Sequence, residues 1–168
     1  MIAPSGIGFT VESQEIAKNP ALQKLQDWDK QAVAEVIEFR GETTVVVPAN
    51  LLERAAEFLS SEPALRFTFL ADLTAVDRFP IEPRFELNYQ LLSIEKKLKL
   101  RLRVKLPGAD PVVSTVVPVW PTANWLEREV FDLFGVRFHG HPDLRRILMP
   151  EEWEGYPLRK DYPVEGFR

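Results

Sequence analysis

The stretch NWLEREVFDLFGVRFHGHPDLRRILMPEEWEGYPLRKDYPV, residues Asn124 to Val164, decides how the rest of the chain is organised. It opens with a helical pattern of about ten residues and passes through Gly135. About thirty residues then follow neither the period of a helix nor that of a strand. An apolar segment without a period needs another surface to pack against. We therefore take this stretch as the main indication of function.

The helical part has clear predicted limits. Asn124 fits the N-cap position, Glu127 lies three residues later as in a capping box, and Gly135 fits the residue after the helix. The apolar stripe of this helix nevertheless includes Glu127. Its carboxylate is therefore either a cap for its own helix end or a buried acid with a dedicated partner. The spacing already explains a cap, which we favour.

The part after the helix is predicted to be an extended arm. Prolines at 142, 150, 157 and 163 exclude a continuous helix or a central strand. Residues 139–168 hold five basic and six acidic side chains, so little is expected to hold the arm to its own domain. A neutral, aromatic-rich ribbon favours a protein–protein interface. We predict that it docks on a partner together with the polar side of the helix, where Trp125 lies. The predicted docking residues are Trp125, Arg128, Glu129, His141, Arg145, Arg146, Trp153, Tyr156, Arg159, Lys160 and Asp161.

The only histidines, His139 and His141, are separated by one glycine. Such a pair can bind a metal when a strand points both rings to one side, but a site needs further ligands, such as Asp143 or Glu127. A His-Pro sequence more often shapes a turn. We therefore predict no metal site and no catalytic residue in this chain, and keep a metallohydrolase as an alternative.

The sequence before this stretch indicates an α+β domain. A helix begins at Asn19-Pro20, and a second follows the predicted capping box of Asn50 and Glu53. Period-two patterns predict strands within 32–39, 43–47, 67–73, 85–91 and 98–106, and an edge segment over 112–120. We predict a two-layer fold with helices packed on a mostly antiparallel or mixed five-stranded sheet. The predicted parts are a flexible lead-in (1–18), the α+β domain (19–138) and the proline-rich docking arm (139–168).

One predicted strand carries a cation at every second position: Lys99, Arg101, Arg103 and Lys105. We interpret this row as a solvated face with cross-strand ion pairs, one of them to Glu86. The alternative is a docking face for an acidic partner.

Composition excludes several classes of function. The 168 residues include no cysteine, which rules out disulfides and iron–sulfur clusters held by this chain alone. The net charge of −4, with both signs interspersed, gives no basic surface for nucleic acid. No apolar run is long enough to cross a bilayer, and no glycine-rich dinucleotide motif follows a strand. We therefore expect no membrane insertion and no cofactor in this chain.

The residues from Glu127 onward resemble a known family. Glu127-Arg128-Glu129, Asp132-Leu133-Phe134, His141, Arg145 and Ile147-Leu148 are spaced as in the signature of the 30-kDa subunit of respiratory complex I. In bacteria this complex is the proton-translocating NADH-quinone oxidoreductase. The sequence GYPLRKDYP, from Gly155 to Pro163, is similar to the family's ending.

This resemblance implies a structural subunit on the cytoplasmic side of the bacterial inner membrane, where it is peripheral. It implies packing against the 49-kDa subunit near the quinone site and contact with other subunits of the hydrophilic arm of the complex. It also implies that FMN, iron–sulfur clusters, NADH and quinone belong to the assembled complex. A homologous subunit of a membrane-bound hydrogenase, or of a related complex without the NADH module, is the nearest alternative.

Overall fold

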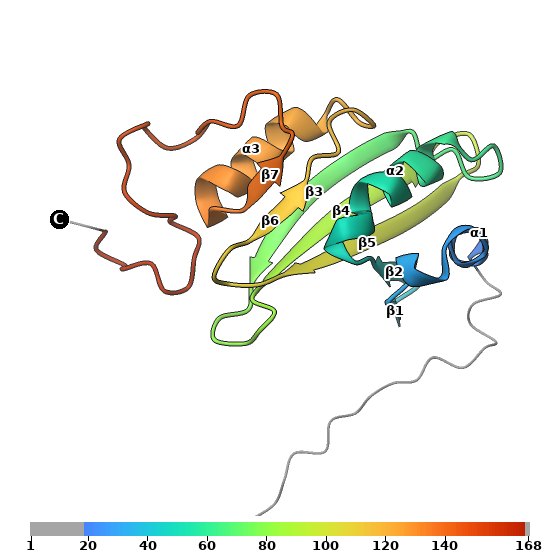
Figure 1. Cartoon of the computed structure of the whole chain (residues 1–168), viewed down its shortest axis with the longest axis horizontal. Helices are drawn as coiled ribbons and strands as arrows, with labels where there is room; N and C mark the ends of the chain where they lie inside the picture. The colour runs from blue at the N-terminus through green and yellow to red at the C-terminus, as the bar shows by residue number, and fades with distance from the viewer. Residues whose placement is uncertain (1–18, 167–168) are drawn as a thin grey trace, which may run out of the picture.

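The computed structural model describes residues 19–166, so the predicted lead-in (1–18) lies outside the described residues. Three α-helices and two short 3-10 turns accompany the strands of this part of the chain (Figure 1). The helices are α1 (Pro20–Trp28), α2 (Leu52–Ser61) and α3 (Ala123–Phe134), and the turns are η2 (Lys30–Ala32) and η3 (Ala49–Leu51). The strands are β1 (Glu35–Phe39), β2 (Glu42–Val46), β3 (Phe69–Asp77), β4 (Phe85–Ser93), β5 (Leu98–Leu106), β6 (Val112–Ser114) and β7 (Arg137–His139).

The main sheet is mixed and has five strands in the order β1-β2-β5-β4-β3. Only the β2–β5 contact is parallel, and the other three contacts are antiparallel. A parallel neighbour requires a crossover, which the chain makes through α2 and the β3–β4 pair before β5 returns beside β2. The predicted α+β class and five-stranded sheet are confirmed.

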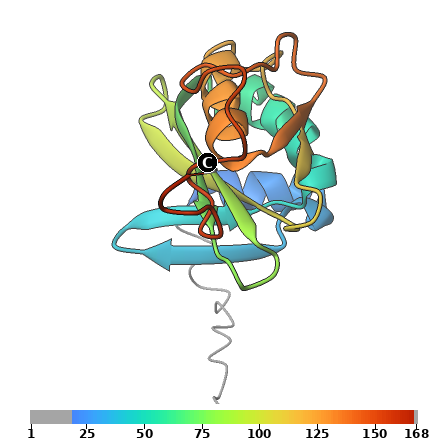
Figure 2. The ribbon, with the colours of Figure 1, turned by 90° about the vertical axis from the view of Figure 1, so that its left-hand side faces the viewer.

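One face of this sheet forms the core. Alternate residues of β4 and β5, such as Tyr89 and its register partner Leu102, are completely buried on that face. Leu52, Ala55 and Leu59 of α2 are buried with them because they form the apolar stripe of that helix. Figure 2 shows the helices gathered on one side of the sheet, as the two-layer prediction requires.

A small second sheet is present that the sequence patterns do not predict. Only Val112–Ser114 of the expected edge segment form a strand, β6, and it pairs in parallel with β7. The helix α3 connects these two parallel strands, so β6, α3 and β7 form a βαβ unit beside the main sheet (Figure 1). The register places Ser114 opposite His139, the residue at which the arm begins.

The predicted helix caps have mixed outcomes. Asn19 caps α1 through its side chain, as predicted, accepting a hydrogen bond of 3.0 Å from the Ala21 N–H. The capping box of Asn50 and Glu53 is wrong, because the 3-10 turn η3 leads directly into α2 and its N-cap residue makes no side-chain bond. Gly135 ends α3 in the left-handed region at φ 72°, as predicted.

No helix of residues 19–166 is both long and apolar enough to cross a membrane.

Candidate functional site: the C-terminal arm and its anchors

The arm (139–168, described to residue 166) is held to α3 through one buried carboxylate, that of Asp132. Its Oδ2 accepts hydrogen bonds from three consecutive arm N–H groups, those of Ile147, Leu148 and Met149, at 2.7–3.0 Å. Its Oδ1 accepts one from the Arg146 guanidinium at 2.6 Å. Burial alone would raise the pKa of Asp132, but these hydrogen bonds outweigh it and lower the pKa below its ordinary value.

Arg146 extends this anchor along the arm. Besides Asp132, its guanidinium donates to the carbonyls of Trp153 and Gly155, at 2.9 and 3.0 Å. One cation therefore joins α3 to two points of a segment that has no strand neighbour. Arg128, which lies on α3 one turn before Asp132, donates in a similar way to the carbonyls of Arg145 and Arg146, both at 3.2 Å. Both arginines satisfy arm carbonyls that regular secondary structure would otherwise pair.

His141 fixes the turn that begins the arm. Its Nδ1 accepts a hydrogen bond from the Asp143 N–H at 3.0 Å, so the ring proton of the neutral imidazole is on Nε2. That nitrogen lies 3.1 Å from the carbonyl oxygen of Asn124 and donates to it. The side chain is completely buried. The predicted turn is therefore built on the ring of His141, and both ring nitrogens have main-chain partners.

The end of α3 and the arm fit closely around Gly135. A Cβ at this position would overlap the ring of Tyr156, so glycine is required both by its positive φ and by the arm above it. Tyr156 packs edge-on against Phe131, with ring centroids 6.5 Å apart. The guanidinium of Arg159 lies over the Tyr156 ring at 4.6 Å and donates to the carbonyl of Phe134 at 2.6 Å.

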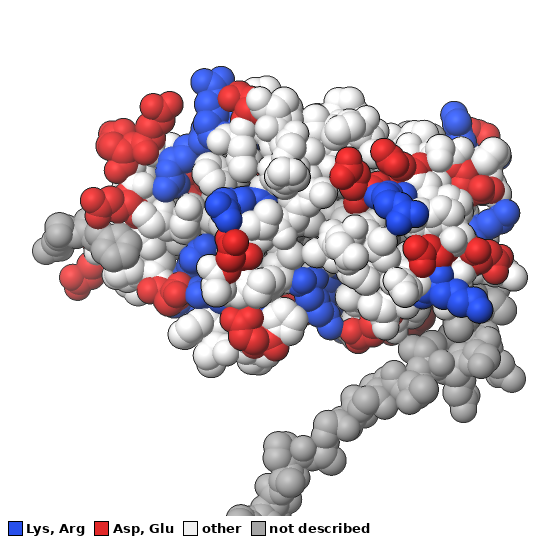
Figure 3. Space-filling model, viewed as in Figure 1, with Lys and Arg blue, Asp and Glu red and all other residues white. Residues whose placement is uncertain are grey.

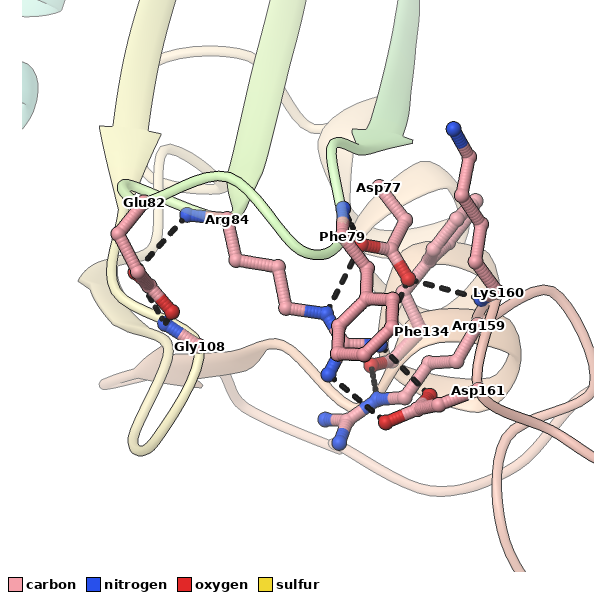
Figure 4. Close-up of polar contacts among 9 residues, drawn as sticks. All are labelled: Asp77, Phe79, Glu82, Arg84, Gly108, Phe134, Arg159, Lys160 and Asp161. Carbon is pink, nitrogen blue, oxygen red and sulfur yellow. Dashed lines mark hydrogen bonds and ion pairs between the residues drawn. The ribbon is translucent and has the colours of Figure 1, made fainter.

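A second anchor ties the arm to the loop between β3 and β4 (Figure 4). The Arg84 guanidinium donates twice to Asp77, at 2.8 and 2.7 Å, and twice to Asp161 of the arm, at 2.9 and 2.6 Å. Asp77 also accepts the Lys160 N–H at 2.8 Å. Burial would raise the pKa of Asp77, but Arg84 and the N–H groups of Lys160 and Phe79 lower it to about 2. This anchor therefore joins residues more than 80 positions apart in the sequence.

These contacts correct one expectation. We expected little to hold the arm to its own domain, but Asp132 and Arg84 hold it at two places. The expectation was wrong because the count of charges balances inside the arm, while the ion pairs form between the arm and the domain. The arm is therefore an ordered surface of this chain.

The predicted docking residues divide into two groups. The arm contacts described above engage Arg128, His141, Arg146, Tyr156, Arg159 and Asp161 within the chain. Glu129, Arg145 and Lys160 are exposed, although Arg145 pairs with Asp143 and the main chain of Lys160 contacts Asp77. Trp125 and Trp153 remain partly available, with 60% and 37% of their surface exposed. The exposed group defines the outward surface of the arm.

Apolar side chains also lie on this outward surface. Leu148, Leu158 and Val164 are 60%, 52% and 104% exposed, close to Trp153 in sequence. Figure 3 shows charged side chains of both signs interspersed over the face in view, with no extended area of one sign. We call the set formed by Trp125 of α3 and by Leu148, Trp153, Leu158 and Val164 of the arm the outer arm surface. It presents apolar contact area in an otherwise polar setting.

Glu127 is a buried acid and the predicted cap is wrong. Because α3 begins at Ala123 and its N-cap Thr122 makes no side-chain bond, Glu127 lies beyond the capping position. Its carboxylate accepts hydrogen bonds from Thr115 Oγ1 at 2.5 Å and the Val116 N–H at 2.8 Å. Burial raises the pKa of Glu127 to about 7, against the lowering effect of these two bonds. Glu127 therefore ties α3 to the segment after β6.

The metal alternative finds no support in the geometry. His141 Nε2 lies 4.0 Å from Glu127 Oε2, but both ring nitrogens already have main-chain partners. His139 is exposed on β7. Across residues 19–166, no three or more histidine and acidic side chains are grouped as a metal would require.

Sequence reasoning misses the anchors that matter most. It gives Asp132 no role of its own and does not single out Arg84 or Asp77. The only signal for Asp132 is its place in the family signature. A helical pattern shows which side of a helix is polar, but it does not show whether water or another segment of the chain covers that side. The Arg84 contact has no local signal, since it spans 77 positions in sequence.

Comparison with known proteins assigns this chain to a class of respiratory-complex subunits. The family model described as respiratory-chain NADH dehydrogenase, 30 Kd subunit, matches residues 45–168, and the chain belongs to this family. The family resemblance is thus confirmed. Among relatives, the C subunit of NADH-quinone oxidoreductase from Geotalea uraniireducens is 46% identical, over 88% of this chain and 89% of the relative. The same subunit from Geobacter sulfurreducens is 48% identical, over 88% and 91%.

Two solved structures share the fold. A trypsin-resistant fragment of Nqo5 is 38% identical, with a TM-score of 0.57 over 66% of this chain and 89% of that chain. A chain of the membrane-bound sulfane sulfur reductase, an archaeal respiratory membrane complex, is 26% identical, with a TM-score of 0.71 over 90% and 85%.

Proposed function

We propose that this chain is a non-catalytic structural and assembly subunit of the peripheral arm of proton-translocating NADH-quinone oxidoreductase. It packs against the 49-kDa subunit near the quinone site, on the cytoplasmic side of the membrane. The observation that carries this proposal is the outer arm surface, which exposes two tryptophans and three aliphatic side chains on α3 and on the arm that α3 holds in place.

The anchoring of the arm favours docking. Because Asp132 and Arg84 already hold the arm, binding a partner requires little further ordering of the chain. Trp125 is supported from one side by Arg128, whose guanidinium lies 5.0 Å from its ring centre, while the other side faces solvent. Rigidly held aromatic residues of this kind often dominate the binding energy of an interface.

The polar groups support a structural role. Asp132, Arg128, Arg146 and Arg84 use their hydrogen-bonding capacity on main-chain groups and ion pairs within the chain. Catalytic groups instead keep a donor or acceptor directed at a substrate position. In this proposal FMN, the iron–sulfur clusters, NADH and quinone are bound by other subunits of the assembled complex.

A second candidate function is the homologous subunit of a membrane-bound respiratory complex without the NADH module. The observation that favours it is the match to the sulfane sulfur reductase chain, with a TM-score of 0.71 over 90% of this chain. The sequence identities point the other way, at 26% against 38%. The subunits that co-purify with the chain distinguish the two candidates.

The test is to recover the tagged chain from native membranes and quantify its partners by mass spectrometry. We expect the 49-kDa subunit together with NADH-module subunits. Recovery of the 49-kDa subunit should fall at least tenfold when Trp125 and Trp153 are both replaced by alanine. Phe69→Ala is the matched control, since Phe69 is an exposed aromatic on β3, outside the arm. Full recovery by the double variant would exclude the outer arm surface as the docking site. Partners lacking NADH-module subunits would favour the second candidate.

A further inference from the structure

The row of cations on β5 is not evenly neutralised. Arg101 pairs with Glu42 at 2.6 Å, Arg103 with Glu86 at 3.7 Å, and Lys105 with Glu35 at 2.8 Å. Lys99, at the beginning of the strand, has no ion pair with any residue of 19–166, and neither has Lys97 before it. Ion pairs within the sheet therefore neutralise most of the cations of β5. Among residues 19–166, Lys97 and Lys99 at one end remain without an ion pair.

The same end of β5 lacks strand pairing on one side within residues 19–166. Pairing with β4 extends the full length of β5, from Leu106 to Leu98. Pairing with β2 covers only Arg101–Arg103 against Thr44–Val46. Among the described residues, 98–100 of β5 therefore pair with β4 but not with β2, whose first residues, Glu42 and Thr43, continue opposite them without pairing. Figure 2 shows the β1–β2 hairpin projecting away from the β4–β5 turn.

The main chain of Lys99 faces this open side. The Val47 N–H donates to the Arg103 carbonyl at 2.8 Å, so the main-chain groups of Arg103 point toward β2. Because these groups alternate along a strand, those of Arg101 and Lys99 point the same way. Arg101 lies within the β2 pairing, but Lys99 lies beyond its end. Among residues 19–166 its N–H and C=O therefore have no strand partner on this side, and such an edge can accept another strand.

A cavity of about 610 Å³ occupies the opening between the two strands. Its β4–β5 side is lined by four leucines and two lysines: Leu91, Leu92, Leu98, Leu100, Lys97 and Lys99. The other side is formed by the β1–β2 hairpin, including Glu38 and Glu42. We call this opening the β2–β5 cleft. Within residues 19–166 it combines four leucines among polar lining residues, an unpaired strand edge at Lys99 and two cations without ion pairs.

We propose that the β2–β5 cleft is an interaction site for an extended segment of a partner subunit, which adds a short strand beside Lys99 and places an acidic side chain against Lys97 and Lys99. Strand addition uses the unpaired main chain for affinity and the side-chain environment for specificity. An acidic residue matches the excess of positive charge, because Lys97 and Lys99 face only one carboxylate without an ion pair in residues 19–166, that of Glu38, while Glu42 is paired with Arg101. The choice of a partner subunit as the occupant rests on the proposed function.

This site is separate from the outer arm surface. The arm contacts Arg84, immediately before β4 begins at Phe85, whereas the cleft lies beside the other end of β4, near Leu92. Across a nine-residue strand the two ends are roughly 25 to 30 Å apart. A partner at the cleft therefore makes contacts that the arm does not reach.

The first test compares amide hydrogen exchange of residues 97–101 in the isolated chain and in the complex purified from membranes. We expect exchange at Lys99 to slow at least tenfold in the complex, while Leu98 and Leu100, which pair with β4, change less. Equal exchange at Lys99 in both states would overturn the proposal. Failure of the chain to purify with a complex at all would instead count against the proposed function.

The second test is a pair of charge variants. Lys99→Gln removes a cation of the cleft, and Lys105→Gln removes the same type of residue from the same strand and face, six positions further along and outside the cleft. We expect recovery of the partner that occupies the cleft to fall about tenfold for Lys99→Gln and to stay unchanged for Lys105→Gln. Equal recovery with both variants would contradict a role for the cleft cation.

The alternative occupant to be tested is the N-terminal part of the same chain, because Asn19 lines the cleft. The isolated full chain is therefore measured beside a chain that begins at Asn19. Slow exchange at Lys99 in the isolated full chain that is lost in the shorter chain would assign the cleft to residues 1–18 and overturn the partner proposal. Fast exchange in both isolated chains, with protection only in the complex, supports it.

Discussion

The arm and the outward face of β5 both carry rows of charged side chains, yet the two regions use them differently. On β5 the charges lie on a solvated face, as in the pair of Lys105 with Glu35, whose side chains are 33% and 49% exposed. Where the arm meets α3, in contrast, the pair of Arg146 with Asp132 of the helix is largely buried, at 15% and 0%. Exposed pairs contribute little, whereas a buried charge that loses its partner is costly. The comparison shows that burial of the charges, and not their number, separates the two regions.

Removing the carboxylate of Asp132 is expected to have the largest effect. Asp132→Ala leaves three main-chain N–H groups without their acceptor and the Arg146 cation without its carboxylate, which should cost about 3 to 5 kcal/mol of unfolding free energy. Urea unfolding measures the loss. Glu129→Ala, on the exposed side of the same helix, is the control and should change the stability by less than about 0.5 kcal/mol.

The pH dependence of this effect follows from the direction of the pKa shift. The pKa of Asp132 is lower in the folded chain than its ordinary value of 3.8. Its contribution is therefore complete above that value and is lost as the pH falls through the folded pKa. Equal stability of Asp132→Ala and the parent chain near neutral pH would show that the arm is held in some other way.

Glu127 extends the comparison to a buried carboxylate that, among residues 19–166, makes no ion pair with an arginine or lysine and accepts from the Thr115 hydroxyl and the Val116 N–H. Its pKa rises from 4.5 in the unfolded chain to about 7 in the folded one, so the folded state binds the proton more tightly. Its ionisation therefore costs stability progressively between about pH 4.5 and pH 7, by roughly 3 kcal/mol at most. Glu127→Gln should remove this decline while keeping an acceptor for the Val116 N–H.

The measurement is urea unfolding at pH 5 and pH 8 for both chains. We expect the parent chain to lose more stability across this interval than Glu127→Gln does. The groups facing Glu127 are the ring of His141 and the buried hydroxyl of Tyr89, whose pKa is raised by its burial and by the charge of Glu127. Parallel pH profiles of the two chains would show that Glu127 stays ionised throughout.

The elements of the main sheet could be predicted because their patterns are local. The alternation in β4 and β5 defines both the strands and their buried face, and Gly135 marks the end of α3 by its backbone conformation alone. Three-residue strands such as β6 and β7 give no period to detect, so the second sheet could not be found. Its existence depends on α3 bringing the two strands together.

The anchors of the candidate site could not be predicted for a different reason. Capping-box spacing assigns Glu127 to the helix start, but moving the helix start by one or two residues, to Ala123, is enough to remove that role. Arg84 and Asp161 are brought together only by the path of the arm around α3. The sequence identifies the aromatic and charged residues of the arm, but it does not show which of them face the domain and which face outward.

The smallest effect is expected on β5. Lys105→Gln breaks an ion pair between half-exposed side chains, so the unfolding free energy should fall by less than about 1 kcal/mol, and high salt should abolish most of that difference. Urea unfolding at low salt and in about 1 M NaCl, which reduces the screening length to about 3 Å, measures both parts. Arg146 gives the contrasting case, because its charge is shielded from salt by the arm and by Asp132. Suppose instead that Lys105→Gln lowered the unfolding free energy by several kcal/mol and that the loss persisted in salt. The outward face of β5 would then be a stabilising network like the contacts of the arm, and burial would not separate the two regions.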